Sequence, residues 1–173
     1  MKKILISVVA ALVVVTAIFY VILKKNAAKE QEAAPVVAKN ATNELPWLPM
    51  TNADGTRFMA HSLKGKTILV LFQPDCDHCQ REATQISEHL EAFAPYNVYF
   101  VSDAGAPQLL KFAQDYKLAG QQNIHFTSAT ANDIYENMGS TPVPAMYVFS
   151  EEGKLVKSFI GETPIEVILH YLK

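Results

Sequence analysis

Cysteine is scarce in this chain, with two residues among 173. Two cysteines cannot build the disulfide framework of a small secreted scaffold, and they cannot supply four thiolates for a structural zinc site. Glycine is also scarce, and its seven residues exclude collagen-like and other glycine-rich repeats. Charged residues make up 18% of the chain and aromatic residues 10%, which excludes disorder throughout. We therefore expect one folded domain in which the two cysteines act as a pair.

Charge is absent from residues 4–23, where only three side chains carry a polar group. Twenty residues at about 1.5 Å each span the roughly 30 Å hydrocarbon core of a membrane. Lysines flank this run on both sides, whereas a cleavable signal peptide has a shorter apolar core followed by a small-residue cleavage site. Residues 1–25 are therefore predicted to be an uncleaved signal anchor, and cleavage near residues 26–28 is the alternative.

The chain beyond the predicted anchor has a different composition. Residues 26–45 are rich in Ala, Lys, Glu, Asn and Gln and lack aromatic residues, which is typical of a flexible stalk. Residues 46–173 suffice for a single hydrophobic core. Residues 26–173 hold 11 basic and 17 acidic residues, a net charge of −6, which argues against nucleic acid as a partner. The slight excess of positive charge before the apolar run favours export of the C-terminal domain.

Strands and helices are predicted to alternate through the folded part. Asp54-Gly55 predicts the turn of a small hairpin, and the apolar run 67–72 predicts a strand buried on both faces. Apolar residues at helical spacing predict a helix over 77–93. Further strands are expected at 97–102, 124–126, 145–149 and 155–160, and further helices at 107–118, 132–138 and 164–172. This order predicts an α/β fold with a central mixed sheet flanked by helices.

The two cysteines lie in the motif Cys76-Asp77-His78-Cys79, between the buried strand and the helix. Residues three apart on a helical turn share a face, so both sulfurs can come within disulfide reach. The free N–H groups of the helix start stabilise a thiolate on Cys76, and a protonated His78 would add to this effect, whereas Asp75 and Asp77 oppose it. A fixed bridge over so short a loop would stabilise the fold little, so a redox-active pair is favoured over an inert disulfide.

Metal binding is the other chemistry open to this pair. Cys76 and Cys79 could act with one of the five histidines, but no histidine lies at a second paired spacing that suggests a site. We therefore expect no metal and no cofactor.

Three features of the sequence carry a resemblance to a known family. They are the strand-CxxC-helix unit, the run Thr141-Pro142-Val143-Pro144-Ala145 before a strand, and Asp54-Gly55 followed by residues 63–66 before the first core strand. Together they resemble the thioredoxin-like superfamily, and within it the membrane-anchored, exported TlpA/ResA-like thiol-disulfide oxidoreductases, over about residues 46–172. The resemblance implies a thioredoxin-like fold with an N-terminal hairpin and an extra strand-helix unit before a cis-proline.

The resemblance also implies roles for individual residues. Cys76 would attack the disulfide of a partner protein, and Cys79 would resolve the mixed disulfide. The family's cis-proline falls on Pro144, and backbone groups of Val143 would bind the partner.

Three further side chains belong to the predicted site. Asp77 and His78, between the cysteines, are predicted to contact the substrate. Glu82 lies three residues after Cys79, where related exported reductases carry an acidic residue near the active site. Its carboxylate either exchanges protons with the second sulfur or is a solvated helix glutamate near the helix N-terminus.

The function that this resemblance implies is disulfide exchange with protein cysteines. The domain would lie in the periplasm of a bacterium, anchored in the inner membrane by a single pass through residues 4–23, and would act as a reductase supplied with electrons by a membrane protein. A histidine beside the second cysteine favours an oxidising pair instead.

Other functions are open to this superfamily. A copper-delivery module or a non-catalytic scaffold is the alternative, although copper chaperones of the superfamily use a wider cysteine spacing with a distal histidine. A peroxidase is disfavoured because the peroxiredoxin branch needs a Pro and a Thr or Ser where this chain has Leu69 and Gln73. The stretch Gln73-Pro74-Asp75 also replaces the tryptophan-containing stretch of many relatives.

Overall fold

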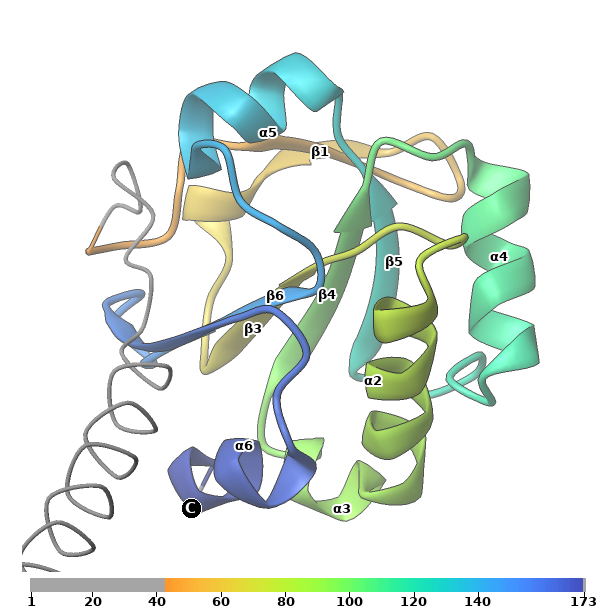
Figure 1. The fold of residues 1–173 in the computed structure, drawn as a ribbon. Helices are drawn as coiled ribbons and strands as arrows, with labels where there is room; N and C mark the ends of the chain where they lie inside the picture. The colour runs from red at the N-terminus through yellow and green to blue at the C-terminus, as the bar shows by residue number, and fades with distance from the viewer. Residues whose placement is uncertain (1–42, 173) are drawn as a thin grey trace, which may run out of the picture. The chain divides into compact units, whose positions relative to one another are not determined.

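The computed structural model describes residues 43–172, which fold around a seven-stranded mixed sheet (Figure 1). The predicted anchor and most of the predicted stalk lie outside the described residues. Within residues 43–172, no helix is long and apolar enough to cross a membrane. The strands are β1 (Pro49–Asn52), β2 (Arg57–Met59), β3 (Thr67–Leu71), β4 (Asn97–Ser102), β5 (Ile124–Ser128), β6 (Ala145–Phe149) and β7 (Leu155–Ile160). The helices are η1 (Ala60–Ser62), α2 (Asp77–Glu88), α3 (Leu90–Phe93), α4 (Ala106–Asp115), α5 (Ala131–Met138) and α6 (Ile165–Tyr171).

The sheet has the strand order β2-β1-β5-β4-β3-β6-β7. Strands β3, β4 and β5 run parallel, and β6 pairs antiparallel with β3 before it turns into β7. The β1–β2 hairpin turns at Asp54-Gly55, as predicted, and β1 continues the sheet by antiparallel pairing with β5. The β4–α4 and β5–α5 units both precede β6, so the predicted mixed sheet with an extra strand-helix unit is confirmed.

Strand β3 is the centre of the core, and all five of its residues are buried. Because side chains alternate across a strand, its two faces join two different clusters. Ile68 and Val70 pack in the cluster that includes α2, α4 and α6, whereas Leu69 and Leu71 pack in the cluster that includes Met138 of α5 and the residues near β1. In Figure 1, α2 and α4 cover one face of the sheet and α5 lies beside β1.

The helix predicted over 77–93 is interrupted. Helix α2 ends at Glu88, His89 leaves helical geometry with φ −128° and ψ 31°, and α3 follows from Leu90 to Phe93. The backbone N–H of His89 donates to Ile86 O, a bond three residues back that tightens the last turn. Phe93, at the end of α3, is fully buried in the cluster that contains Ile68 and Val70.

The ordered fold begins before residue 46. Leu155 N donates to Asn43 O at 2.8 Å, Leu45 N donates to Gly153 O at 2.8 Å, and Leu45 is buried. Asn43 and Leu45, which the sequence places in the stalk, therefore contact the packed domain.

Candidate active site

Cys76 is the N-cap of α2, at the carboxyl end of the central strand β3. Its backbone is extended, with φ −88° and ψ 115°, and its sulfur accepts a hydrogen bond from the backbone N–H of Cys79 at 3.4 Å. A sulfur in this position meets unpaired N–H groups and the positive end of the helix dipole, both of which stabilise a thiolate. The half-buried Cys76 is also the more exposed of the two cysteines.

Cys79 lies on the first turn of α2 and is buried, with 2% of its surface exposed. Burial raises the pKa of the Cys79 thiol well above its usual value, and the hydrogen bond with Cys76 and the nearby charges act in the same direction. A buried thiol that keeps its proton is a poor nucleophile. The environments of the two sulfurs therefore differ in the sense expected for an attacking Cys76 and a resolving Cys79.

The Val143-Pro144 peptide bond is cis, as expected from the sequence, and Pro144 is buried. The sulfur of Cys76 lies 3.9 Å from the carbonyl oxygen of Val143. The chain thus brings the turn before β6 against the start of α2, although the two segments are 67 residues apart. Val143 is partly exposed, so it borders the surface beside the Cys76 sulfur.

Glu82 faces the protein interior, on the same side of α2 as Cys79. Its exposed fraction is 2%, so the alternative of a solvated helix glutamate is wrong. Among the described residues, no hydrogen bond reaches its Oε1 atom. Burial raises the pKa of the Glu82 carboxyl to about 8, while a backbone hydrogen bond from Thr163 opposes the shift. The carboxyl is thus poised to gain and lose a proton near neutral pH.

The exposed side chains of His78 and Arg81 meet a carboxylate from a distant loop. His78 Nδ1 lies 2.5 Å from Glu162 Oε2, and Arg81 Nη2 and Nε donate to the two oxygens of Glu162 at 2.7 Å each. These contacts hold the pKa of Glu162 at about 2. Arg81 Nη2 also lies 2.7 Å from His78 Nδ1, so this nitrogen donates to Glu162 or accepts from Arg81 according to the tautomer.

The sequence alone does not predict this cluster of His78, Arg81 and Glu162. Gly161 N donates a hydrogen bond to Pro144 O at 2.8 Å. This contact holds the chain just after β7, including Glu162, close to the cysteines. Helical spacing predicts that Arg81 lies beside His78, one turn earlier. Nothing in the sequence predicts that either residue contacts Glu162. Asp77 is exposed beside this cluster, on the first turn of α2.

Gln73 connects the ends of two strands in front of Cys76. Its Nε2 donates to Asp103 Oδ1 at 2.5 Å, and its Oε1 accepts from Ser102 Oγ at 3.2 Å. Gln73 therefore forms a polar bridge between the end of β3 and the end of β4. The bridge holds Asp103 close to the site.

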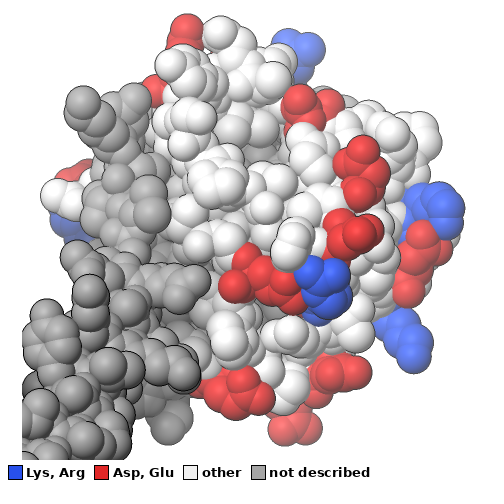
Figure 2. Space-filling model, viewed as in Figure 1, with Lys and Arg blue, Asp and Glu red and all other residues white. Residues whose placement is uncertain are grey.

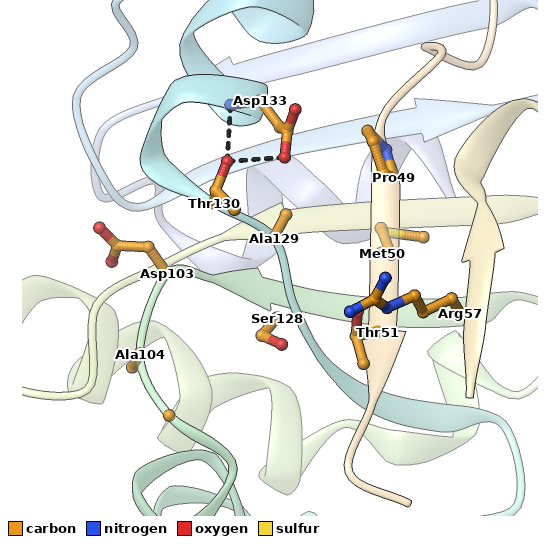
Figure 3. Close-up of a pocket in the computed structure, with 11 residues that line it drawn as sticks. Pro49, Met50, Thr51, Arg57, Asp103, Ala104, Ser128, Ala129, Thr130 and Asp133 are labelled. Carbon is orange, nitrogen blue, oxygen red and sulfur yellow. Dashed lines mark hydrogen bonds between the residues drawn. The ribbon is translucent and has the colours of Figure 1, made fainter. Parts of the chain in front are cut away.

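Two pockets lie near the carboxyl end of β4, and Asp103 lines both of them. One, of about 290 Å³, also includes Gln73 and Val143. The other, of about 460 Å³, is shown in Figure 3 and includes Arg57, Thr130 and Asp133. In Figure 3 the carboxylate of Asp103 points away from Arg57. Of the two, the smaller pocket is the one that contains Val143, whose carbonyl oxygen lies beside the Cys76 sulfur.

Metal ligands are not gathered in the described part of the chain. Across residues 43–172, no group of three His, Cys, Asp or Glu side chains is placed to hold a metal ion.

Comparison with known proteins gives one family match. A model of the AhpC/TSA family matches residues 40–158, more than half of the chain. No curated protein matches the chain.

Several solved structures resemble the chain at low sequence identity. MTB DsbF, in its mixed oxidized and reduced forms, is 19% identical with a TM-score of 0.62, covering 76% of this chain and 96% of that one. StoA from Bacillus subtilis is 18% identical with a TM-score of 0.57, covering 79% and 99%. Copper-bound ScoI from Arabidopsis thaliana is 15% identical with a TM-score of 0.59, covering 75% and 94%. At such identities these likenesses establish the fold.

Proposed function

The chain belongs to the AhpC/TSA family and has the thioredoxin-like fold, and from this premise we propose that it exchanges disulfides with protein cysteines through Cys76 and Cys79. The observation that carries the proposal is the hydrogen bond from Cys79 N to the Cys76 sulfur at the start of α2. It places one half-exposed sulfur where a thiolate is stabilised and a second, buried sulfur one turn away.

The exchange proceeds in two thiol-disulfide exchange steps. The Cys76 thiolate attacks one sulfur of a partner's disulfide, forming a mixed disulfide and releasing the partner's other sulfur as a thiolate. The Cys79 thiolate then attacks the Cys76 sulfur, forming the Cys76-Cys79 disulfide and releasing the partner's second thiolate. The partner disulfide is reduced by two electrons and the cysteine pair is oxidised by two.

Glu82 serves the second step as a proton acceptor. Cys79 must lose a proton before it can attack, and its burial makes that loss costly. Because the Glu82 carboxyl has its pKa raised to about 8, its ionised form is a stronger base than an ordinary carboxylate. Glu82 lies one helical turn from Cys79 on the same buried face, so a proton can pass between them directly or through a water molecule.

The proposed setting is the extracytoplasmic side of a bacterial inner membrane. The uncharged run of residues 4–23 supports a membrane anchor, and the resemblance to exported TlpA/ResA-like proteins supports a reductase that receives electrons from a membrane protein. Protein disulfides are then the substrates.

A disulfide-exchange assay tests the proposal. Reduced protein is mixed with a disulfide-bonded peptide, and peptide thiols are measured over time, with Cys76→Ser as the inactive control. Equilibration with glutathione gives the reduction potential of the pair, and a potential well below that of the glutathione pool supports the reductase direction. Equal activity in the wild type and Cys76→Ser would refute the function.

Two further assays on the same protein distinguish disulfide exchange from the competing functions. A peroxidase would consume hydrogen peroxide at a rate comparable to its disulfide exchange, and we expect slow consumption because Leu69 and Gln73 replace the residues that the peroxiredoxin branch needs. A copper-delivery protein would bind Cu(I) stoichiometrically in a titration. Tight copper binding without disulfide exchange would favour the metal-binding alternative.

A further inference from the structure

A groove lies near the Cys76 sulfur, between the carboxyl ends of β3 and β4 and helix α5. We call it the Val143 groove, after the residue whose carbonyl oxygen lies 3.9 Å from the Cys76 sulfur. Its volume is about 290 Å³, which suits one long side chain. A partner bound through a disulfide to Cys76 would therefore have residues close to this groove.

The walls of the groove are mostly apolar. Ile134 and Tyr135 come from α5, whereas Leu71, Phe72 and Val101, from β3 and β4 and their ends, are almost fully buried. Tyr135 is 62% exposed, so it presents a large ring surface to a partner. Aromatic and branched walls of this kind pack well against the aliphatic stem of a lysine or arginine.

Asp103 places a negative charge on this apolar groove. Its Oδ1 accepts from Gln73 Nε2, and no hydrogen bond to its Oδ2 occurs within residues 43–172. Its carboxylate also points away from Arg57, the cation of the neighbouring pocket (Figure 3). One carboxylate oxygen is therefore left for a cationic group that enters the groove.

The surroundings of Cys76 have the same sign of charge. Asp75 and Asp77 are exposed on either side of the cysteine, and the nearby Arg81 is bound to Glu162. Figure 2 shows this face of the molecule, where acidic side chains, with several basic ones among them, lie along the right and lower parts of a largely uncharged surface. A cationic segment of a partner is attracted by this field, and an acidic one is repelled.

We propose that the Val143 groove selects partner disulfides that carry a lysine or arginine within two residues of the attacked cysteine. An extended chain advances about 3.3 Å per residue, so a side chain one or two positions from the attacked sulfur reaches the groove. The stem packs on Tyr135 and Ile134, and the charged end meets Asp103. This inference rests on the proposed disulfide exchange and names the sequence around its substrate cysteines.

The test uses the full-length reduced protein in a neutral detergent and three cyclic disulfide peptides. The peptides are identical except for lysine, norleucine or glutamate in the position before the attacked cysteine. Norleucine has an uncharged aliphatic stem, so it separates packing from charge. The uncharged reagent bis(2-hydroxyethyl) disulfide reports the reactivity of Cys76 without the groove.

We expect the lysine peptide to react fastest and the glutamate peptide slowest, with about a tenfold ratio at low salt. Asp103→Asn keeps an acceptor for Gln73 and should reduce this ratio at least threefold. The matched control Glu91→Gln removes an equal charge from the exposed surface of α3 and should leave the ratio unchanged. At 1 M salt the Debye length falls to about 3 Å, and the ratio should shrink.

The outcomes are distinguishable. Equal rates for lysine and norleucine, or an unchanged ratio in Asp103→Asn, would overturn the selection of a cation. Reaction with bis(2-hydroxyethyl) disulfide but with no peptide would overturn the groove as a docking surface while the exchange chemistry stands. Absence of reaction with every disulfide would refute the proposed function itself, and this inference with it.

Discussion

Glu82 lies one helical turn after Cys79 on the buried face of α2, and its negative charge contributes to the raised pKa of the Cys79 thiol. Neither side chain has a compensating cation in its described surroundings: Arg81, the nearby base on α2, points outward to Glu162. A buried acid and a buried thiol are thus held together in a place where ionising either group raises the cost of ionising the other.

This arrangement predicts an unusual dependence of stability on pH. Glu82 has its pKa raised from 4.5 to about 8 in the folded protein. Between these two values the unfolded chain loses the proton and the folded protein keeps it, so the free energy of unfolding falls as pH rises. The stability present below about pH 4.5 is lost progressively up to about pH 8.

Glu82→Gln should remove this dependence. Because the amide cannot ionise, the variant should gain roughly 2 to 4 kcal/mol over the wild type on going from pH 5 to pH 8, an upper range for a shift of this size. Urea unfolding of both reduced proteins at the two pH values measures the difference. Parallel pH profiles for the two proteins would show that Glu82 titrates normally.

The two cysteines should differ in their ability to hold a partner. Cys79→Ser keeps the half-exposed Cys76 sulfur but removes the sulfur proposed to resolve the mixed disulfide, so covalent complexes with partner proteins should accumulate. Cys76→Ser should form few, since Cys79 is buried with a raised pKa. Non-reducing electrophoresis after alkylation compares the two variants. Equal trapping by both would invalidate the assigned roles.

Most of the fold could be predicted because its signals are local. The buried run of β3, the hairpin turn at Asp54-Gly55 and the helical periodicity after Cys76 each depend on a few neighbouring residues. The cis bond at Pro144 was predicted from the resemblance, and no physical signal in the sequence distinguishes it from Pro142.

The parts of the site that could not be predicted depend on distant segments. Helical spacing places Glu82 near Cys79, but its burial depends on the chain near Thr163, which packs over that face. Glu162 reaches Arg81 across 81 residues because β7 pairs with β6 beside Pro144. A sequence contains no local mark of such pairings, and so the burial of Glu82 and the ion-pair cluster both required the structure.

The ion pair between Arg81 and Glu162 should restrain the reactivity of Cys76. Glu162→Gln removes a negative charge and leaves Arg81 free to attract the Cys76 thiolate, since the two groups already interact electrostatically. We expect faster alkylation by iodoacetamide below pH 7, by about two- to fivefold. Global stability should change by less than about 1 kcal/mol, because exposed ion pairs contribute little.

Arg81→Gln provides the opposite test. Without the guanidinium, Glu162 keeps its charge near the site, so alkylation should become slower than in the wild type. If both variants accelerate alkylation equally, the cluster acts by covering the sulfur and not by its charge.

The residues just before β1 should be required for full stability. Leu45 is buried, its backbone N–H donates to Gly153 O, and Asn43 O accepts from Leu155 N. Because Asn43 and Leu45 are held in place by these contacts, the contacts outweigh the entropy cost of ordering the segment. A chain that starts at residue 46 should therefore have a lower free energy of unfolding than one that starts at residue 43, by at most about 3 kcal/mol. Urea unfolding of the two chains measures the difference, and equal stabilities would show that the packed domain begins after Leu45.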